Sequence, residues 1–185
     1  MPRTRALLAL HAGYRACHCG PAMAVIEWNE TIAETAQRYA DTCPTGHSAV
    51  GTAMRARNHG ENLAQGMASP AEAVAAWYNE IKDHDYDQPE WKPCTGHFLQ
   101  IAYEPVRAFG CGVKDCADGR HFVCQYDAIP SSASVDLEAN VPRLCAGQSQ
   151  GPIRAQGSCY KSAQATELRR MWGGAPGNRS TSRSL

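Results

Sequence analysis

Nine cysteines in a chain of 185 residues constrain the fold more than any other feature of this sequence. A reducing cytosol rarely tolerates so many thiols unless a metal ion holds them. Zinc sites of that kind use closely spaced cysteines, yet Cys17-His18-Cys19 is the only tight pair and no Cys-x-x-Cys occurs. The cysteines therefore predict disulfide bonds and secretion into an oxidising, extracellular compartment.

The charge balance and the apolar runs exclude two broad classes of function. The chain has 18 basic and 18 acidic residues, so no net charge attracts the phosphates of nucleic acid over a long range. The longest apolar run near the start, residues 6–10, is far shorter than the roughly 18 residues that cross a bilayer. We therefore expect a protein that neither binds nucleic acid nor is integral to a membrane.

Direct marks of secretion are sparse. The apolar run at residues 6–10 is also too short for the core of a signal peptide, so secretion is inferred from the cysteines. Two triplets, Asn29-Glu30-Thr31 and Asn178-Arg179-Ser180, fit the pattern of N-glycosylation acceptors. Asn29 and Asn178 are accordingly candidate glycosylation sites.

Helical spacing of apolar residues predicts three helices in the first half of the chain. One includes residues 7–14, and a second begins after the capping residue Asn29 and ends near Cys43. The third opens with Ser69-Pro70-Ala71-Glu72, in which a capping serine is followed by proline at the first helical position and by a glutamate that can bond back. Glu80 falls on the edge of its apolar stripe.

Short runs of β-forming residues follow Pro93 and predict strands. These runs are 98–103, 109–115 and 121–126. The dipeptide Asp118-Gly119 is favoured as a two-residue hairpin turn between the last two strands, and this register places Val113 opposite Cys124. The hairpin would then present its cysteines on defined faces.

Alternation along this hairpin predicts two disulfide bonds. Cys111 and Cys124 share one face of the sheet, whereas Cys116 points to the other face. A helix packed on that second face would offer Cys43 as a partner. We therefore predict the pairs Cys111–Cys124 and Cys43–Cys116.

The sequence loses its periodicity beyond about residue 142, and from Gly173 its composition cannot bury enough apolar surface to order itself. We expect a domain over residues 6–141 and a cysteine-containing extension with a disordered tail over residues 142–185. An odd number of cysteines then remains, so one is free or pairs between chains; the five are Cys17, Cys19, Cys94, Cys145 and Cys159. Of these, Cys145 and Cys159 could close a loop in the extension.

Eight short motifs occur in a fixed order along the chain. They are Leu7-Leu8-Ala9-Leu10-His11-Ala12-Gly13-Tyr14-Arg15, Trp28 through Cys43, His47-Ser48, Gly60-Glu61-Asn62-Leu63, Trp77-Tyr78-Asn79-Glu80, Gly96-His97-Phe98-Leu99-Gln100, Gly110-Cys111-Gly112 and Phe122-Val123-Cys124-Gln125-Tyr126. Together they resemble the CAP superfamily, which comprises cysteine-rich secretory proteins, antigen five and pathogenesis-related one. The resemblance implies an α+β fold, a three-layer α-β-α sandwich with a central, mostly antiparallel sheet.

The resemblance also implies a cleft lined by two histidines and two acidic residues, which map onto His47, Glu61, Glu80 and His97. Imidazole and carboxylate groups converging on one cleft suit Zn²⁺ or a similar divalent ion, or else form a hydrogen-bonded structural network. Both alternatives stay open at this point. The other five histidines are expected to be ordinary core or surface groups; they are His11, His18, His59, His84 and His121.

Members of this family bind sterols and other lipids, so the resemblance implies lipid or partner binding, in defence or host interaction, as the expected function. In this chain the corresponding segment is 100–109, with Gln100, Tyr103 and Phe109 as candidate lipid contacts. The spaced aromatic residues Phe98, Tyr103 and Phe109 could present an apolar rim. The alternative is that these aromatic residues face the core. A metal-dependent hydrolase using the cleft is the competing hypothesis, but the chain has no His-Glu-x-x-His and no Gly-x-Ser-x-Gly motif. We therefore expect a binding module rather than an enzyme.

Overall fold

The structure is a computed structural model, and it describes the whole chain except residues 1, 22, 24, 49–58, 131–133 and 149–185. Its elements are α1 (Pro2–Arg15), β1 (Glu27–Trp28), α2 (Glu30–Ala40), β2 (Gly60–Gln65), α4 (Pro70–Tyr78), the 3-10 helix η1 (Asn79–Asp83), α5 (Gly96–Ala102), β3 (Ala108–Cys116), β4 (Gly119–Tyr126) and α6 (Ser134–Asn140). Among the described residues, no helix is both long and apolar enough to span a membrane.

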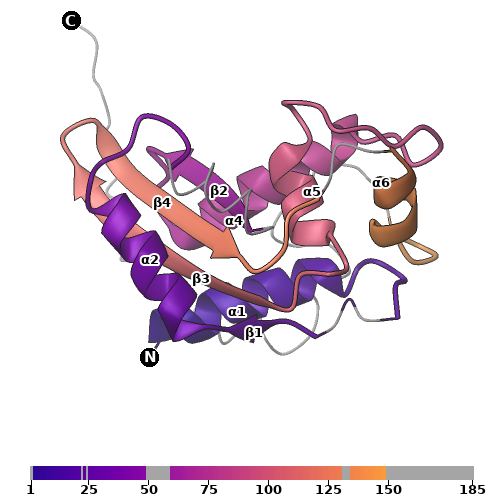
Figure 1. The fold of residues 1–185 in the computed structure, drawn as a ribbon, viewed down its shortest axis with the longest axis horizontal. Helices are drawn as coiled ribbons and strands as arrows, with labels where there is room; N and C mark the ends of the chain where they lie inside the picture. Colours follow the sequence, from indigo (N-terminus) through magenta and orange to yellow (C-terminus); the bar gives the residue numbers. More distant parts are fainter. Residues whose placement is uncertain (1, 22, 24, 49–58, 131–133, 149–185) are drawn as a thin grey trace, which may run out of the picture.

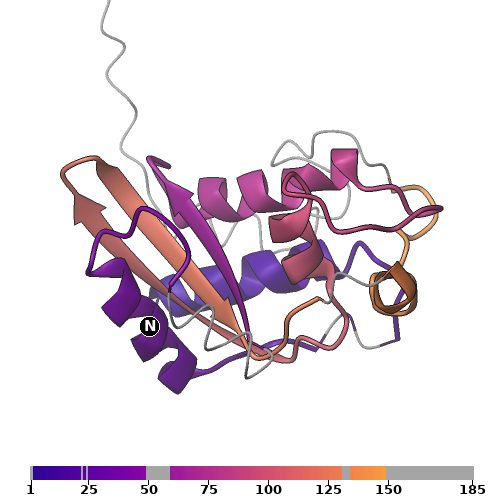
Figure 2. The same ribbon diagram turned by 45° about the horizontal axis from the view of Figure 1, so that its top comes forward.

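Four strands form one mixed sheet in the order β1-β3-β4-β2. Only the short β1 runs parallel to its neighbour β3; the β3–β4 and β2–β4 pairs are antiparallel. Helix α2 lies along one face of this sheet, while α1, α4 and α5 lie toward the other (Figures 1 and 2). The expected α+β fold with helices around a mostly antiparallel sheet is confirmed.

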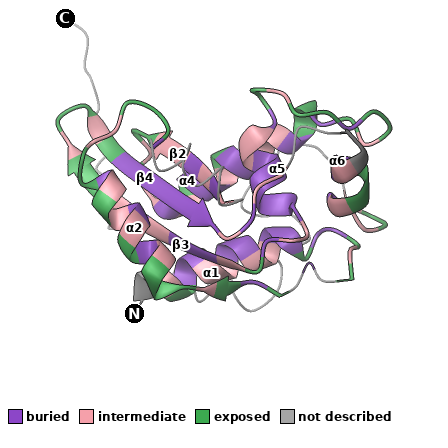
Figure 3. Ribbon diagram, viewed as in Figure 1, coloured by how far each residue is buried: buried purple, intermediate pink, exposed green. Residues whose placement is uncertain are grey.

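Alternation along β4 divides the core between the two faces of the sheet. Phe122 and Tyr126 belong to the large cluster that includes residues of α1, α4 and α5, whereas Val123 packs with Ala36 and Ala40 of α2. The central strand is buried along most of its length (Figure 3). The face of the sheet to which a β4 side chain points therefore determines which helical layer it contacts.

Two of the three predicted helices begin with the expected caps. The Asn29 side chain accepts a hydrogen bond from the Ile32 amide, and the Ser69 side chain accepts one from the Glu72 amide. The Glu72 carboxylate bonds the amide of Ala68 rather than that of Ser69, so the reciprocal bond is displaced by one residue. Asn29 itself is exposed, and Asn178 lies outside the described residues.

The predicted strand over residues 98–103 is wrong, because this segment forms helix α5, Gly96–Ala102. Phe98, Leu99 and Ile101 are all buried, so the run is apolar on successive positions and not on alternate ones. A short apolar run of this kind fits a buried helix as well as a strand.

The predicted turn is also displaced. Cys116 pairs with Gly119, so the turn residues are 117 and 118, and Phe122, not Cys124, lies opposite Val113. Gly119 follows the turn with φ +124°, a conformation that glycine adopts readily. The register differs from the predicted one by two residues, which leaves every side chain on its expected face.

For that reason the two predicted disulfides are both present: Cys111–Cys124 joins opposed residues of the hairpin, and Cys43–Cys116 joins the end of α2 to β3. The suggested Cys145–Cys159 bond is wrong, because Cys145 pairs with Cys19 across a sequence separation of 126 residues. Cys17 is also disulfide-bonded, and Cys159 lies outside the described residues. Among the described cysteines, Cys94 is the free one, and it is exposed.

A buried arginine joins the first helix to the rest of the domain. Arg15, in the last turn of α1, donates hydrogen bonds to the carbonyl oxygens of five residues: Met23, Ile101, Tyr103, Glu104 and Val106. Burial lowers the pKa of Arg15 to about 10, and the nearby charge of Arg107 acts in the same direction. The guanidinium therefore stays charged at neutral pH and fixes the segment between α5 and β3.

Helix α2 approaches β3 closely because two glycines provide the space. A Cβ atom at Gly110 would overlap the backbone of Ala33, and one at Gly112 would overlap the backbone of Gln37. The Gln37 side chain in turn donates to the Val113 carbonyl and accepts from the Val113 amide, each at 3.0 Å. The helix thus covers the edge of a strand that β1 is too short to pair.

We predict that Gly110→Ala lowers the free energy of unfolding by about 3 kcal/mol, the upper part of the range for overpacked cores. The added methyl group must displace the α2 backbone, which cannot move without breaking its contacts with the sheet. Gly46→Ala is the matched control, since a Cβ at that position meets no atom within 4 Å. Urea unfolding of both variants tests this, and equal midpoints would contradict the close contact.

Candidate functional site

The four residues predicted for the cleft form two histidine–carboxylate pairs. His47 follows α2 and its Nδ1 lies 3.0 Å from Oε1 of Glu61 on β2. His97, in the first turn of α5, places its Nδ1 2.7 Å from Oε1 of Glu80 in η1. Each imidazole is therefore oriented by a carboxylate through the same ring nitrogen.

Glu61 is the centre of the first pair. Its side chain is only 4% exposed, whereas that of His47 is 59% exposed. The amide and hydroxyl of Ser48 donate to the two carboxylate oxygens, and Gln125 Nε2 donates to Oε2 at 2.9 Å. Burial would raise the pKa of Glu61, but the hydrogen bonds from His47, Gln125 and Ser48 together outweigh it and hold the pKa below its usual range. Glu61 is thus a buried, ionised carboxylate.

Glu80 holds the second pair by capping a helix. Its Oε2 accepts hydrogen bonds from the amides of His97 and Phe98, which have no partners within the first turn of α5. The His97 ring also stacks near that of Trp77, with centroids 6.2 Å apart. Backbone and ring contacts therefore fix the direction in which His97 points.

A buried chain of hydrogen bonds connects the site to the core. Asn62, next to Glu61, donates from Nδ2 to the His97 carbonyl and to the Tyr126 hydroxyl. The Tyr126 hydroxyl lies 3.0 Å from His11 Nε2, and His11 Nδ1 lies 2.9 Å from the Leu7 carbonyl. A carbonyl only accepts, so Nδ1 of His11 carries the proton and Nε2 accepts from Tyr126. Burial lowers the pKa of His11 to about 4, which keeps this imidazole neutral.

The structure brings the four cleft residues together two by two and not as one compact cluster. Within the described ranges, the group of at least three His, Cys, Asp or Glu side chains with ligand atoms within 4.8 Å of one another is Cys116, Asp118 and His121. No three of the four cleft residues, all of which the structure describes, meet this criterion. Their Nε2 atoms, however, make no hydrogen bond to another described residue. The two imidazoles thus keep one nitrogen each for a ligand.

The three candidate lipid contacts lie in the interior. Gln100, Tyr103 and Phe109 are 3%, 7% and 0% exposed. Gln100 donates to the Ala128 carbonyl, and the Tyr103 hydroxyl donates to Asp136. The aromatic rings therefore follow the alternative in which they face the core, and their side chains form no exposed rim.

Sequence reasoning missed several residues that hold the site. Ser48, Asn62, Gln125 and Tyr126 all belong to the motifs quoted above, yet no role was assigned to them. The signal that would have found Gln125 is the strand β2, in which Glu61 pairs directly with Gln125 of β4. The polar sequence of residues 60–65 lacks the apolar alternation that predicts a strand.

The sequence of this chain matches a known protein family. The family described as CAP, the cysteine-rich secretory protein family, matches residues 8–126. The chain belongs to the CAP family. This CAP chain is 36% identical over 105 residues to Protein PRY2 of Saccharomyces cerevisiae, an alignment covering 56% of the chain and 31% of the relative. It is 33% identical over 108 residues to mouse cysteine-rich secretory protein 1, covering 55% and 44%.

Solved structures share the CAP fold. Schistosoma mansoni venom allergen-like protein 4 superposes with a TM-score of 0.60 at 19% identity, over 77% of this chain and 94% of that chain. A structure described as NaASP2 with Zn²⁺ gives a TM-score of 0.57 at 18% identity, over 78% and 86%. At these identities the likeness concerns the fold alone. The CAP chain also spans less than half the length of the two curated relatives named above.

We predict that this CAP domain loses stability between pH 7 and pH 5. The pKa of His11 and that of His18 are each lowered to about 4 by burial, from the ordinary value of 6.5. In this window the unfolded chain binds protons that the folded chain excludes, so the free energy of unfolding falls as the pH falls. The loss is about 2 kcal/mol per buried histidine at pH 5.

Urea unfolding at the two pH values measures this loss. His11→Gln should flatten the pH dependence, whatever it does to stability at pH 7; His59→Gln is the control, because it replaces a histidine that is only partly buried. An unchanged slope in His11→Gln would show that His11 does not contribute.

Proposed function

We propose that this CAP domain is a secreted binding module and not an enzyme. In this proposal the paired histidines of the cleft bind a divalent metal ion such as Zn²⁺, and the domain binds a sterol, another lipid or a protein partner. Secretion is supported by the three described disulfide bonds and by kinship with proteins named as cysteine-rich secretory proteins.

The observation that carries the metal proposal is the hydrogen bonding of the two imidazoles. Histidines that bind metals usually donate the other ring N–H to a carboxylate, which fixes the ring and raises the basicity of the ligating nitrogen. His47 and His97 have this arrangement with Glu61 and Glu80. Their donor type fits zinc, and NaASP2, a relative in fold, is described with Zn²⁺.

The residues also indicate what kind of site this is. Two imidazoles are fewer than the three or four protein ligands of catalytic and structural zinc sites. Both carboxylates are engaged by amides or hydroxyls, so they serve to orient the rings. Bound zinc would supply positive charge at the cleft, and water or groups of a partner would complete its coordination. We therefore expect weak, reversible metal binding.

Calorimetric titration with Zn²⁺ tests this proposal. The oxidised protein should bind one ion saturably, and His47→Ala/His97→Ala should abolish that binding while the far-UV circular dichroism stays unchanged. His59→Ala is the matched control, because it removes a histidine outside the pairs. No binding by the folded wild-type protein would make the four residues a structural network.

The same protein preparation tests the competing hydrolase hypothesis. A zinc-loaded hydrolase would cleave peptide or ester substrates and would lose that activity in Glu61→Gln, which removes the carboxylate charge next to His47. We expect no turnover. Zinc-dependent cleavage that Glu61→Gln abolishes would contradict the assignment as a binding module.

Kinship with the CAP family supports the lipid proposal, and the burial of Gln100, Tyr103 and Phe109 restricts it. A lipid that contacts this domain has to use other side chains, because these three fill the core. We expect saturable uptake of a sterol or a fatty acid that survives Tyr103→Phe, since the ring of this residue is internal.

Equilibrium binding of radiolabelled cholesterol and palmitate to the purified protein measures this uptake. If Tyr103→Phe abolishes binding in a folded variant, segment 100–109 would be the lipid-binding segment after all. An absence of saturable binding across both probes would remove lipid from the proposal and leave a protein partner.

A further inference from the structure

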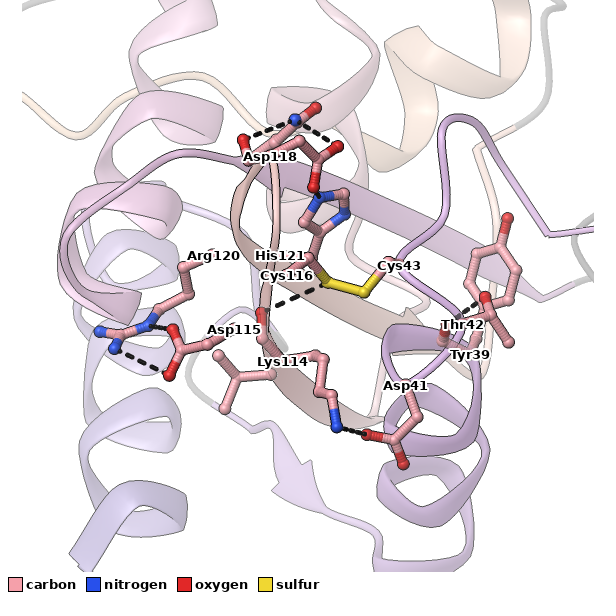
Figure 4. The surroundings of a disulfide bond; sticks show 12 residues. Tyr39, Asp41, Thr42, Cys43, Lys114, Asp115, Cys116, Asp118, Arg120 and His121 are labelled. Carbon is pink, nitrogen blue, oxygen red and sulfur yellow. Dashed lines mark hydrogen bonds and ion pairs between the residues drawn. A yellow bond between two sulfur atoms is a disulfide. The ribbon is translucent and has the colours of Figure 1, made fainter.

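A second cluster of metal-ligating side chains lies at the tip of the β3–β4 hairpin, at the disulfide between Cys43 and Cys116. Figure 4 shows the His121 ring between the Asp118 carboxylate and this disulfide. Ligand atoms of Cys116, Asp118 and His121 all lie within 4.8 Å of one another. In the oxidised protein the Cys116 sulfur is bonded to Cys43, so it offers no thiolate.

The residues of this cluster differ from the four of the cleft pairs, although β4 and the segment after α2 also carry residues of that site. Cys116 ends β3, His121 lies on β4, Asp118 occupies the turn between them, and Cys43 follows α2. Cys116 and His121 share the face of the sheet on which α2 packs, as does Val123. The fold therefore holds the histidine and both cysteines together whether or not the sulfur atoms are bonded.

His121 is buried and oriented by a carboxylate, as metal-binding histidines usually are. The residue is 3% exposed, and its Nε2 lies 2.9 Å from Asp118 Oδ1, which leaves the second ring nitrogen for another partner. Gln65 Nε2 donates to the other carboxylate oxygen of Asp118 at 2.9 Å. A carboxylate that orients an imidazole, and is itself held by an amide, is the outer arrangement found around zinc-binding histidines.

We propose that reduction of the Cys43–Cys116 disulfide converts this cluster into a zinc site, with the two thiolates and His121 as ligands and Asp118 as the fourth ligand or the orienting carboxylate. The Cα atoms of the two cysteines are 5.9 Å apart; Cys116 ends β3 and Cys43 follows α2, which packs on that strand, so we expect the sulfur atoms to stay close after the bond breaks. Two thiolates and one imidazole form a ligand set that favours Zn²⁺ over Mg²⁺ or Ca²⁺.

A dithiol can supply the electrons and protons that reduce the Cys43–Cys116 disulfide. Two electrons pass from the dithiol to the S–S bond, which breaks, and the dithiol closes into its own disulfide. Its two protons pass to Cys43 and Cys116 as they become thiols. Zinc binding then displaces these two protons to solvent, and the charges of the two thiolates neutralise the ion.

Cobalt(II) is the probe for this site, because thiolate ligands give it a charge-transfer absorption in the near ultraviolet that oxygen and nitrogen ligands do not. The experiment uses Cys94→Ser protein, which removes the exposed free thiol, after limited reduction with a phosphine that does not compete for the metal as a dithiol would. Mass spectrometry of alkylated cysteines identifies the fraction in which only Cys43 and Cys116 are reduced.

We expect one thiolate-coordinated cobalt ion per reduced chain beyond any ion held by the cleft, no thiolate band in the oxidised chain, and loss of the band when zinc displaces the cobalt. Cys43→Ser/Cys116→Ser should lose the band, and His121→Gln should weaken cobalt binding at least tenfold. His47→Ala/His97→Ala should leave the band unchanged, which separates this site from the cleft proposal.

Three outcomes would overturn the proposal. The first is a folded, selectively reduced chain without the thiolate band. The second is a band that persists in Cys43→Ser/Cys116→Ser. The third is loss of the far-UV circular dichroism on selective reduction, since no preassembled ligand set would then remain. As a second measurement, bound zinc should slow the return of the disulfide in air at least tenfold, and an unchanged rate would also count against the site.

Discussion

A single buried cation, the guanidinium of Arg15, holds the end of α1 against the segment that leads from α5 into β3. Its bonds to five carbonyl groups satisfy backbone that would otherwise lie unpaired away from water, where each lost partner costs about 1–3 kcal/mol. The planar fork of arginine suits several acceptors at once, and the single ammonium group of lysine does not. Because α5 carries His97, the position of one cleft histidine depends on this anchor.

The same dependence continues through the hydrogen-bonded chain from His11 to Tyr126 and Asn62, which ends at the backbone of His97. The position of His97 therefore depends on three polar side chains that are buried in the core, those of His11, Tyr126 and Asn62. Burial lowers the pKa of His11 and keeps its imidazole neutral, the form in which Nε2 accepts from Tyr126. Acid that protonates His11 would therefore break the hydrogen-bonded chain that leads to His97.

Much of the fold could be predicted because its signals are local. The caps at Asn29 and Ser69 and the alternation along the hairpin follow from a few neighbouring residues. The two disulfide pairs were predicted correctly although the turn was misplaced, because a register shift of two residues leaves each side chain on the same face of the sheet. Helix α5 was missed since burial on all sides removes periodicity. The identity of the four cleft residues came from their motifs; that they form two separate pairs depends on tertiary distances, which no local pattern encodes.

The bond between Cys19 and Cys145 closes nearly the whole described domain into a covalent ring. A peptide bond cut once anywhere inside that ring leaves both fragments attached, so the chain remains one molecule with its sheet and helices still tethered. A domain closed in this way can be nicked by a protease and yet not dissociate. Its working lifetime is then set by the survival of disulfides as much as by that of the backbone.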